Sequence, residues 1–341
     1  MRILHVINSL DVGSATNLLK LVNGLAGRGV ANEVMAIRRR GELEADFRAA
    51  VAALHPIRTI DADDYDLVCG WLYQGCVAAS LLAPSGKVIW NVRHALDRQV
   101  RESFATLSCL GLMGSVLRAR AVVANSSAAL ANHRERGLRA EDWVLIENGI
   151  DIERFAPGSD TTVRRSLNID EQAFVMLQVA RVQPHKGHRK LIAAFSEVAA
   201  EFDDMHLVLV GEGTEKLRGT RIYGVGYVND VRPYLADADL LVNPSQTESF
   251  PTVVLEAMSC GVPCVVTRTG ASADLVGATG FVTNLDARSI AETLRTTLML
   301  GREVLQARGQ AARARAIGRF SDRRAEDAYY QFFLQSTRHA T

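Results

Sequence analysis

The chain lacks the features that would place it across a membrane or on a nucleic acid. None of its apolar runs approaches the roughly 18 residues that a membrane span needs. Its 39 basic and 38 acidic residues leave a formal net charge of +1 with no dominant basic stripe, which argues against a nucleic-acid partner. The first residues, MRILHVINSL, are too short and too polar for a signal peptide and predict a first strand.

Cysteine is scarce too, and its pattern does not suggest a metal site. The chain has 5 cysteines, an odd number, and none stands in a zinc-like cluster. Cys260 and Cys264 flank an expected helix end and a proline, so a shared core is favoured over a ligand pair. We therefore expect a protein of the reducing cytoplasm. The other cysteines are Cys69, Cys76 and Cys109.

One segment is more lipid-like than the rest of the chain. A helix is expected over residues 99–117, and its part 107–117 is strongly apolar. Two interpretations stay open: a core helix, which the sequence alone favours, or a helix that rests on the inner membrane face as a peripheral anchor. The arginines that flank the segment are Arg98, Arg101, Arg118 and Arg120.

The order of apolar runs predicts an α/β protein with two doubly wound domains. A length of 341 residues exceeds what one core usually organises. Short strands alternate with amphipathic helices in both halves, which is typical of parallel sheets. We expect domains at residues 1–160 and 161–320, with a linker near Pro157 and Gly158, and an aromatic helix in 321–341 that packs back on the first domain. Residues 42–54 are expected to be one helix.

The stretch 245–267, SQTESFPTVVLEAMSCGVPCVVT, carries the most specific signal. It follows a buried strand, and a helix is expected to start near Pro251, with Gly261 at its end. The N–H groups at that helix start, from Phe250 through Thr252 to Val253, favour an anion. Glu248 precedes the helix and Glu256 lies on it, suited respectively to a hydroxylated group and to a ribose.

Three other positions could complete a site at the carboxyl ends of the strands. Arg181 and Lys186 share one strand-to-helix loop, and a planar guanidinium beside an ammonium suits a diphosphate. His94 follows the strand 88–92 directly. Gly13 stands in the first strand-to-helix turn and would let backbone approach a ligand, but the dinucleotide fingerprint GxGxxG is absent.

Together these residues resemble the retaining glycosyltransferases of family four, which have the GT-B fold. The resemblance covers nearly the whole chain. It rests on Arg181 with Lys186, on the run Asn-Gly-Ile-Asp at 148–151, and above all on ESFPTVVLEAM from Glu248 to Met258. The family usually has two adjacent glycines in the first loop, and here Gly13 is followed by Ser-Ala-Thr.

The resemblance implies a role for each site residue. Arg181 and Lys186 would hold the donor diphosphate, Glu256 the nucleotide ribose, Glu248 the hydroxyls of the donor sugar, and His94 would lie beside that sugar. The backbone at Tyr227 and Val228 is similar to the segment that pairs with the base. It implies two Rossmann-like domains, the first on the acceptor side and the second binding the nucleotide sugar.

The expected activity is retaining transfer of a hexose or N-acetylhexosamine from a nucleotide-diphosphate sugar, with UDP-sugar favoured. The acceptor would be a hydroxyl of a glycan or lipid-linked glycan in surface polysaccharide or glycolipid synthesis. Two alternatives remain: a nucleotide-sugar epimerase on the same fold, and a non-catalytic nucleotide-sugar-binding subunit. We expect no cofactor and no metal, because the paired aspartates at 63–64 and 203–204 stand at the entry side of predicted elements and serve as caps and turns.

Overall fold

The computed structural model describes residues 1–11, 13–38, 41–94, 103–158 and 162–338. Within these residues the chain divides into two compact units. The first contains Met1–Gly149 and Asp322–Thr341, and the second is Ile150–Ser321. The second unit thus begins before the expected linker around Pro157. Each unit is a parallel sheet with helices on both faces, the α/β class with two Rossmann-like domains that the sequence predicts.

The first unit is built on a seven-stranded parallel sheet in the order β3-β2-β1-β4-β5-β6-β7. Its strands are β1 Arg2–Ile7, β2 Ala31–Ala36, β3 Ala53–Pro56, β4 Leu67–Trp71, β5 Val88–Val92, β6 Ala119–Ala124 and β7 Ala140–Leu145. Its helices are α1 Ser14–Leu25, α2 Glu44–Ala50, α3 Leu72–Leu82, α4 Phe104–Ser115, α5 Ser127–Glu135 and α13 Asp322–Arg338. The strand order reverses between β1 and β4, which is where doubly wound sheets bind ligands.

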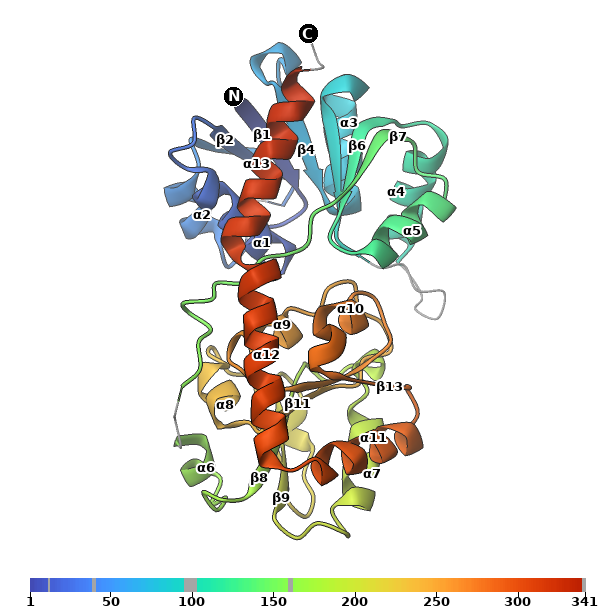
Figure 1. Ribbon diagram of the computed structural model, residues 1–341. Helices are drawn as coiled ribbons and strands as arrows, with labels where there is room; N and C mark the ends of the chain where they lie inside the picture. Colours follow the sequence, from blue (N-terminus) through green and yellow to red (C-terminus); the bar gives the residue numbers. More distant parts are fainter. Residues whose placement is uncertain (12, 39–40, 95–102, 159–161, 339–341) are drawn as a thin grey trace. The chain divides into compact units, whose positions relative to one another are not determined.

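Helices cover both faces of this sheet (Figure 1), and the apolar residues form two separate cores. One contains apolar residues of α1, α2 and the last helix, α13, and the other contains those of α3 and α4. From α13, Tyr329, Phe332 and Phe333 enter the first of these cores. The aromatic residues of the last helix therefore belong to the first unit, although about 170 residues of the second unit separate them from it in sequence.

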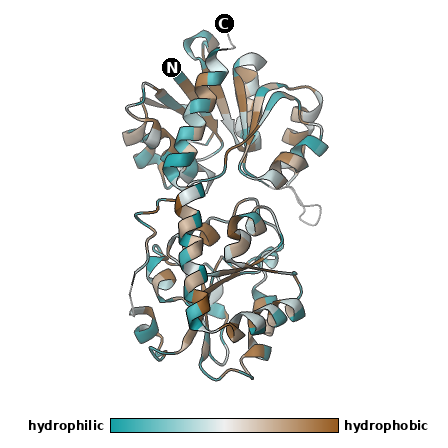
Figure 2. Ribbon diagram, viewed as in Figure 1, coloured by the Kyte–Doolittle hydropathy of each residue, from teal (hydrophilic) through white to brown (hydrophobic). Residues whose placement is uncertain are grey.

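The second unit has a six-stranded parallel sheet in the order β10-β9-β8-β11-β12-β13. Its strands are β8 Phe174–Val179, β9 Met205–Val210, β10 Ile222–Gly226, β11 Leu240–Asn243, β12 Cys264–Thr267 and β13 Phe281–Thr283. Its helices are α6 Thr162–Ser166, α7 His188–Val198, α8 Arg232–Asp237, α9 Thr252–Ser259, α10 Ser272–Val276, α11 Ala287–Met299 and α12 Arg302–Phe320. Here the order reverses between β8 and β11. Figure 2 shows hydrophobic residues concentrated in the strands, whereas hydrophobic and hydrophilic residues alternate along the long helices.

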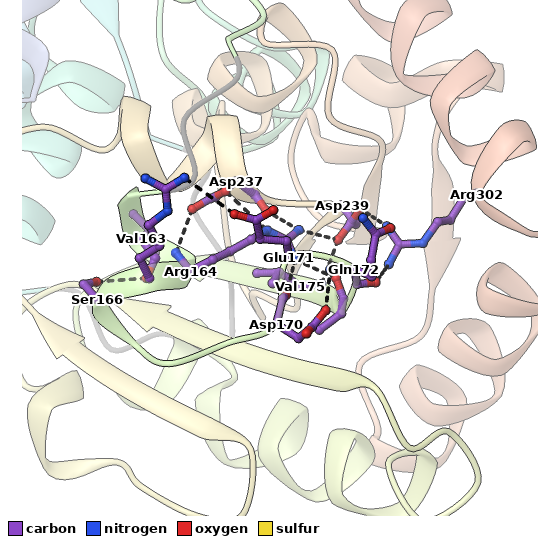
Figure 3. Close-up of polar contacts among 12 residues, drawn as sticks. Val163, Arg164, Ser166, Asp170, Glu171, Gln172, Val175, Asp237, Asp239 and Arg302 are labelled. Carbon is purple, nitrogen blue, oxygen red and sulfur yellow. Dashed lines mark hydrogen bonds and ion pairs between the residues drawn. The ribbon is translucent and has the colours of Figure 1, made fainter.

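An ion-pair network fixes the amino ends of two of these strands (Figure 3). The guanidinium of Arg164 on α6 is buried and contacts Asp237 at 3.3 Å and Asp239 at 2.9 Å, and it donates to the carbonyl of Ala173 at 2.6 Å. Arg302 reaches Asp239 from α12 at 2.8 Å. A buried arginine with two carboxylates and backbone acceptors is fully paired. This network lies at the amino ends of β8 and β11, and the candidate site lies at their carboxyl ends.

The structure corrects one expected element and refines another. The helix expected over residues 42–54 is wrong at its end, because α2 stops at Ala50 and Ala53–Pro56 forms β3, which pairs with β2. Of the helix expected over 99–117, the first residues lie outside the described part, and α4 covers Phe104–Ser115. Within the part of the chain that the structure describes, no helix combines the length and the apolar character that crossing a bilayer requires.

Candidate active site

The candidate donor site lies where the strand order of the second sheet reverses. β8 and β11 are neighbours there, and the loops that leave their carboxyl ends carry Arg181 and Lys186 on one side and Glu248 on the other. Ligands of open α/β sheets bind at such a reversal, because the two loops diverge to opposite faces and leave a crevice between them. The structure therefore brings together three residues that the sequence predicts for one site.

Backbone contacts hold these two loops against each other. The N–H of Gln246 donates to the carbonyl of His185 at 2.7 Å. Gly187 has a positive φ of 76°, and a Cβ there would stand 2.1 Å from the carbonyl oxygen of Pro244, so only glycine fits. The buried Gln178 donates from Nε2 to the carbonyl of Lys186 at 2.8 Å. The loop that carries Lys186 is therefore fixed on both sides, which preorganises its charge.

Lys186 and Glu248 form an ion pair in this crevice. Nζ of Lys186 lies 2.6 Å from Oε1 of Glu248, and the two side chains are 21% and 13% exposed. The resemblance assigns the lysine to the diphosphate and the glutamate to the sugar, adjacent parts of one ligand. In the structure the two groups neutralise each other, so a diphosphate that binds Lys186 would compete with Glu248 for the ammonium group.

Arg181 is available for an anion. It is exposed, two residues beyond the end of β8, and its guanidinium makes no hydrogen bond or ion pair with the other described residues. Tyr227 follows β10 and is 72% exposed, and Val228 beside it packs partly against the core of the unit. These positions continue the same carboxyl edge of the sheet, from β8 through β9 to β10.

The helix α9 begins as the sequence predicts, beside Glu248. Pro251 is its N-cap residue, and the amides of Thr252 and Val253 open the first turn, where the helix itself offers no acceptor. Phe250 is buried and packs edge-to-face on Phe320, with ring centroids 6.1 Å apart. That contact anchors the helix start in the core of the unit, so the direction in which the free amides point is fixed.

Glu256 lies one turn further along α9 and is half-buried. Its carboxylate affects Cys260 in the next turn: burial and, to a smaller extent, the charge of Glu256 raise the pKa of the Cys260 thiol to about 12. Glu256 thus stays partly accessible, whereas its neighbours Leu255 and Ala257 are buried.

Gly13 and His94 belong to the first unit. Gly13 is the N-cap of α1, in the turn that follows β1, and His94 is exposed just beyond β5. Both follow the carboxyl ends of strands of the first sheet: Gly13 follows β1, which borders the reversal of strand order, and His94 follows β5. The structure thus places Thr252, Val253 and Glu256 on α9, and the other predicted site residues in the segments that follow the carboxyl ends of strands.

Sequence reasoning missed the buried network of Arg93, the residue before His94. Arg93 is buried, and its guanidinium stacks 4.8 Å from the ring of Trp71. It donates to Oδ1 of Asn148 and to the hydroxyl of Tyr329, whose own proton reaches Asn91 at 3.0 Å. An arginine after a strand is usually solvated, and its partners lie far away in sequence, so no local pattern could have identified this network.

Possible metal ligands do not gather at the site. Among the described residues there is no group of three or more histidine, cysteine, aspartate or glutamate side chains that could hold an ion. Asp63 lies in a short 3-10 turn before β4 and pairs with Lys87 at 3.1 Å. The other aspartate pair, at residues 203–204, immediately precedes β9. Both pairs thus stand before the amino ends of strands, one pair in each unit.

Comparison with known proteins agrees with this geometry. The family model "Glycosyl transferases group 1" matches residues 173–299, which include Arg181, Lys186, Glu248 and Glu256. A D-inositol 3-phosphate glycosyltransferase of Kribbella flavida is 35% identical over 300 residues, 77% of this chain and 70% of the relative. An N-acetyl-alpha-D-glucosaminyl L-malate synthase of Bacillus anthracis is 25% identical over 284 residues, 80% of this chain and 72% of the relative.

Solved structures share the fold at low identity. Anabaena HepE, crystallised with UDP-glucose, superposes with a TM-score of 0.82 and 21% identity, covering 98% of this chain and 100% of that one. A glycosyltransferase of Rickettsia africae superposes with a TM-score of 0.79 and 16% identity, covering 98% of each chain. Both units are included in these superpositions.

Proposed function

The chain belongs to the group 1 glycosyltransferases of the GT-B fold, and we propose that it transfers a hexose or N-acetylhexosamine from a UDP-sugar to a hydroxyl, with retention at the anomeric carbon. The observation that carries this proposal is the pairing of Lys186 with Glu248 at the reversal of the second sheet. In a diphosphate-sugar the anionic diphosphate and the hydroxylated sugar are adjacent. The crevice offers the complementary groups side by side: an ammonium group for the diphosphate and a carboxylate for the sugar hydroxyls. The complexes of Anabaena HepE with UDP and UDP-glucose support the choice of base.

The proposed chemistry follows from where charge develops. Breaking the bond between the anomeric carbon and the diphosphate leaves negative charge on the phosphate, and Lys186, Arg181 and the amides at the start of α9 stabilise it. Glu248 holds hydroxyls of the sugar, and Glu256 those of the ribose. The leaving phosphate takes the proton of the acceptor hydroxyl as that oxygen bonds to the anomeric carbon on the same face. In this scheme the fixed cations replace a divalent metal.

Incubation with a panel of UDP-, GDP- and ADP-sugars tests this proposal. Slow hydrolysis, followed by release of the nucleotide, should occur with a UDP-sugar and leave the nucleoside diphosphate and the free sugar in its original anomeric form. Conversion of the donor to an epimer without loss of nucleotide would instead indicate an epimerase. Binding without any turnover, with or without acceptor, would indicate a non-catalytic subunit.

We also propose that the acceptor is presented at a lipid surface, for glycolipid or surface polysaccharide synthesis, and that α4 contacts that surface. α4 contains no charged residue, although its outward face is exposed: Phe104 is 87% exposed, and Leu107, Leu112 and the adjoining Val116 are exposed as well. Leu110 and Met113 hold the opposite face in the core. A helix with both a core face and an apolar outer face suits the interfacial region of a bilayer.

Arginines near the end of α4 strengthen this proposal. Gly114 of α4 lies against the backbone of Arg136, and the N–H of Ala119 bonds to the carbonyl of Arg139. The exposed arginines in this area are Arg118, Arg134, Arg136 and Arg139. Basic side chains beside an apolar helix face favour an anionic lipid surface, because each contributes to attraction near the headgroups. The protein would then be a cytoplasmic enzyme that associates peripherally with the inner membrane face.

A further inference from the structure

Leu72 has a backbone conformation that its side chain disfavours. Its φ is 61°, in the left-handed region. Only two other non-glycine residues in the described ranges share a positive φ, Asn168 and Arg221. Asparagine adopts this conformation readily, and the guanidinium of Arg221 compensates by donating to backbone carbonyls such as that of Phe202. A leucine there has no such compensation of its own, and residues held in strained conformations cluster at functional sites.

The strain occurs where the first sheet reverses its strand order. β4 ends at Trp71 and α3 begins at Leu72, so the chain passes from strand to helix without a loop. Trp71 is paired with Ile7, the last residue of β1, and with Asn91 of β5. Leu72 therefore follows β4 at the point where β4 neighbours β1, the strand whose following turn contains Gly13. This is the position at which a doubly wound sheet receives a ligand.

The surrounding structure forces this sharp turn. A Cβ on Gly70 would lie 2.4 Å from Cα of Cys76, and a Cβ on Gly75 would lie 2.4 Å from the carbonyl oxygen of Val6. The start of α3 is therefore packed directly on β4 and β1, with no room for a relaxed connection. The left-handed conformation of Leu72 is imposed by this packing, and the packing can hold the strain.

Burial does not explain why leucine occupies the position. Its neighbours Trp71 and Tyr73 are buried, yet Leu72 remains partly exposed. It packs into none of the four hydrophobic clusters formed by the described residues. Glycine would satisfy the backbone without strain, so neither the backbone nor the core accounts for an aliphatic side chain at this position.

We infer that Leu72 is a specificity-determining residue that contacts the acceptor. This inference rests on the proposed function, in which the first unit receives the acceptor. Its side chain has no hydrogen-bonding group, so it selects for the apolar part of that molecule: the C–H face of a pyranose ring or the alkyl group of a glycolipid. The tight strand-to-helix turn holds the side chain of Leu72 at a fixed place, as a rigid apolar surface at the carboxyl end of β4.

Two substitutions separate the strain from the side chain. Leu72→Ala removes the side chain and keeps the disfavoured φ, whereas Leu72→Gly removes both. We expect Leu72→Gly to unfold about 2 °C above Leu72→Ala, because only glycine relieves the strain. Asn168→Gly, at the other unit's left-handed asparagine, serves as the matched control and should leave activity at the level of the unsubstituted protein.

Activity is measured as release of UDP from the UDP-sugar that the protein hydrolyses, with and without octyl β-D-glucoside below its micelle concentration. The unsubstituted protein should release UDP faster with the glucoside. In both Leu72 variants the increase in rate that the glucoside causes should be at least tenfold smaller, while their affinity for UDP stays the same. Equal unfolding temperatures for the glycine and alanine variants, or full stimulation in both, would overturn the inference. Hydrolysis without stimulation by the glucoside in the unsubstituted protein would also overturn it, and the proposed function would stand. Absence of any hydrolysis would remove the proposed function and the inference together.

Discussion

Replacing Glu248 by glutamine should tighten the binding of UDP while slowing turnover. Oε1 of Glu248 lies 2.6 Å from Nζ of Lys186, so the carboxylate is paired with the ammonium group. Any diphosphate that uses Lys186 must displace this carboxylate. Glutamine keeps the shape of the side chain and removes its charge, so the lysine becomes available to the phosphate. Turnover should fall, because the charged acceptor for hydroxyls of the donor sugar is lost.

The size of the effect follows from the exposure of the pair. At an effective dielectric of about 20, the direct attraction at this distance is roughly 6 kcal/mol, most of which desolvation offsets. Exposed pairs contribute a net ~0.2–1 kcal/mol, and removal of one partner from a buried pair costs ~3–5 kcal/mol. With side chains 21% and 13% exposed, this pair falls between these limits. We expect Glu248→Gln to make the free energy of UDP binding about 1–2 kcal/mol more favourable, which corresponds to roughly 5–30-fold tighter binding of UDP.

Calorimetric titration with UDP, which lacks the sugar, measures this change directly. The gain should disappear when Lys186→Ala is combined with Glu248→Gln, since the lysine is the group that the substitution frees. Lys190→Ala, on the following helix, is a matched control that should leave UDP affinity unchanged. Unchanged or weaker UDP binding by Glu248→Gln alone would refute the competition between carboxylate and phosphate, and with it the assignment of Lys186 to the diphosphate.

Further predictions concern the remaining site residues, the metal and the membrane. Glu256→Gln should weaken UDP binding by roughly 1.5–3 kcal/mol, and unchanged affinity in a titration would make Glu256 only a helix residue. His94→Ala should lower turnover with little change in UDP affinity; poor UDP binding with normal turnover of bound donor would contradict its placement. Activity should persist in excess chelator, and its loss there with recovery on adding magnesium or manganese would disprove a metal-free site. In flotation with anionic liposomes at low salt, Phe104→Asp should release the protein. A control substitution on the core face, Leu110→Asp, should instead lower the unfolding temperature, and failure of the unsubstituted protein to float would favour a soluble acceptor.

Local sequence patterns were sufficient for the class of fold and for most elements. Apolar runs of four to six residues that alternate with amphipathic helices predict two parallel sheets, and the structure confirms both. Helix ends follow from single residues: Ser126 caps α5 by accepting from the N–H of Ala129, and Gly261 follows α9 with a φ of 79°. These signals succeed because caps and periodicity are decided within a few residues.

The missed elements are those whose existence depends on a distant partner. β3 is a four-residue edge strand that the sequence alone joins to the preceding helix, since its apolar residues continue a helical pattern. Only pairing with β2, some twenty residues earlier, makes it a strand. A segment this short has no clear period of its own, so its structure is set by the edge that it meets.

For the site, the sequence by itself determined the kinds of groups and the strand ends at which they lie. It predicted Arg181, Lys186 and Glu248 from strand-to-helix loops that are visible in the local pattern, and Glu256 from the helix that follows one of them. Only the tertiary structure decided which groups meet. The Lys186–Glu248 pair depends on β8 and β11 being neighbours, and the network of Arg93 depends on a helix at the other end of the chain. Strand order and helix docking are set by long-range packing of the cores, in which residues far apart in sequence become adjacent, and local periodicity contains no information about that choice.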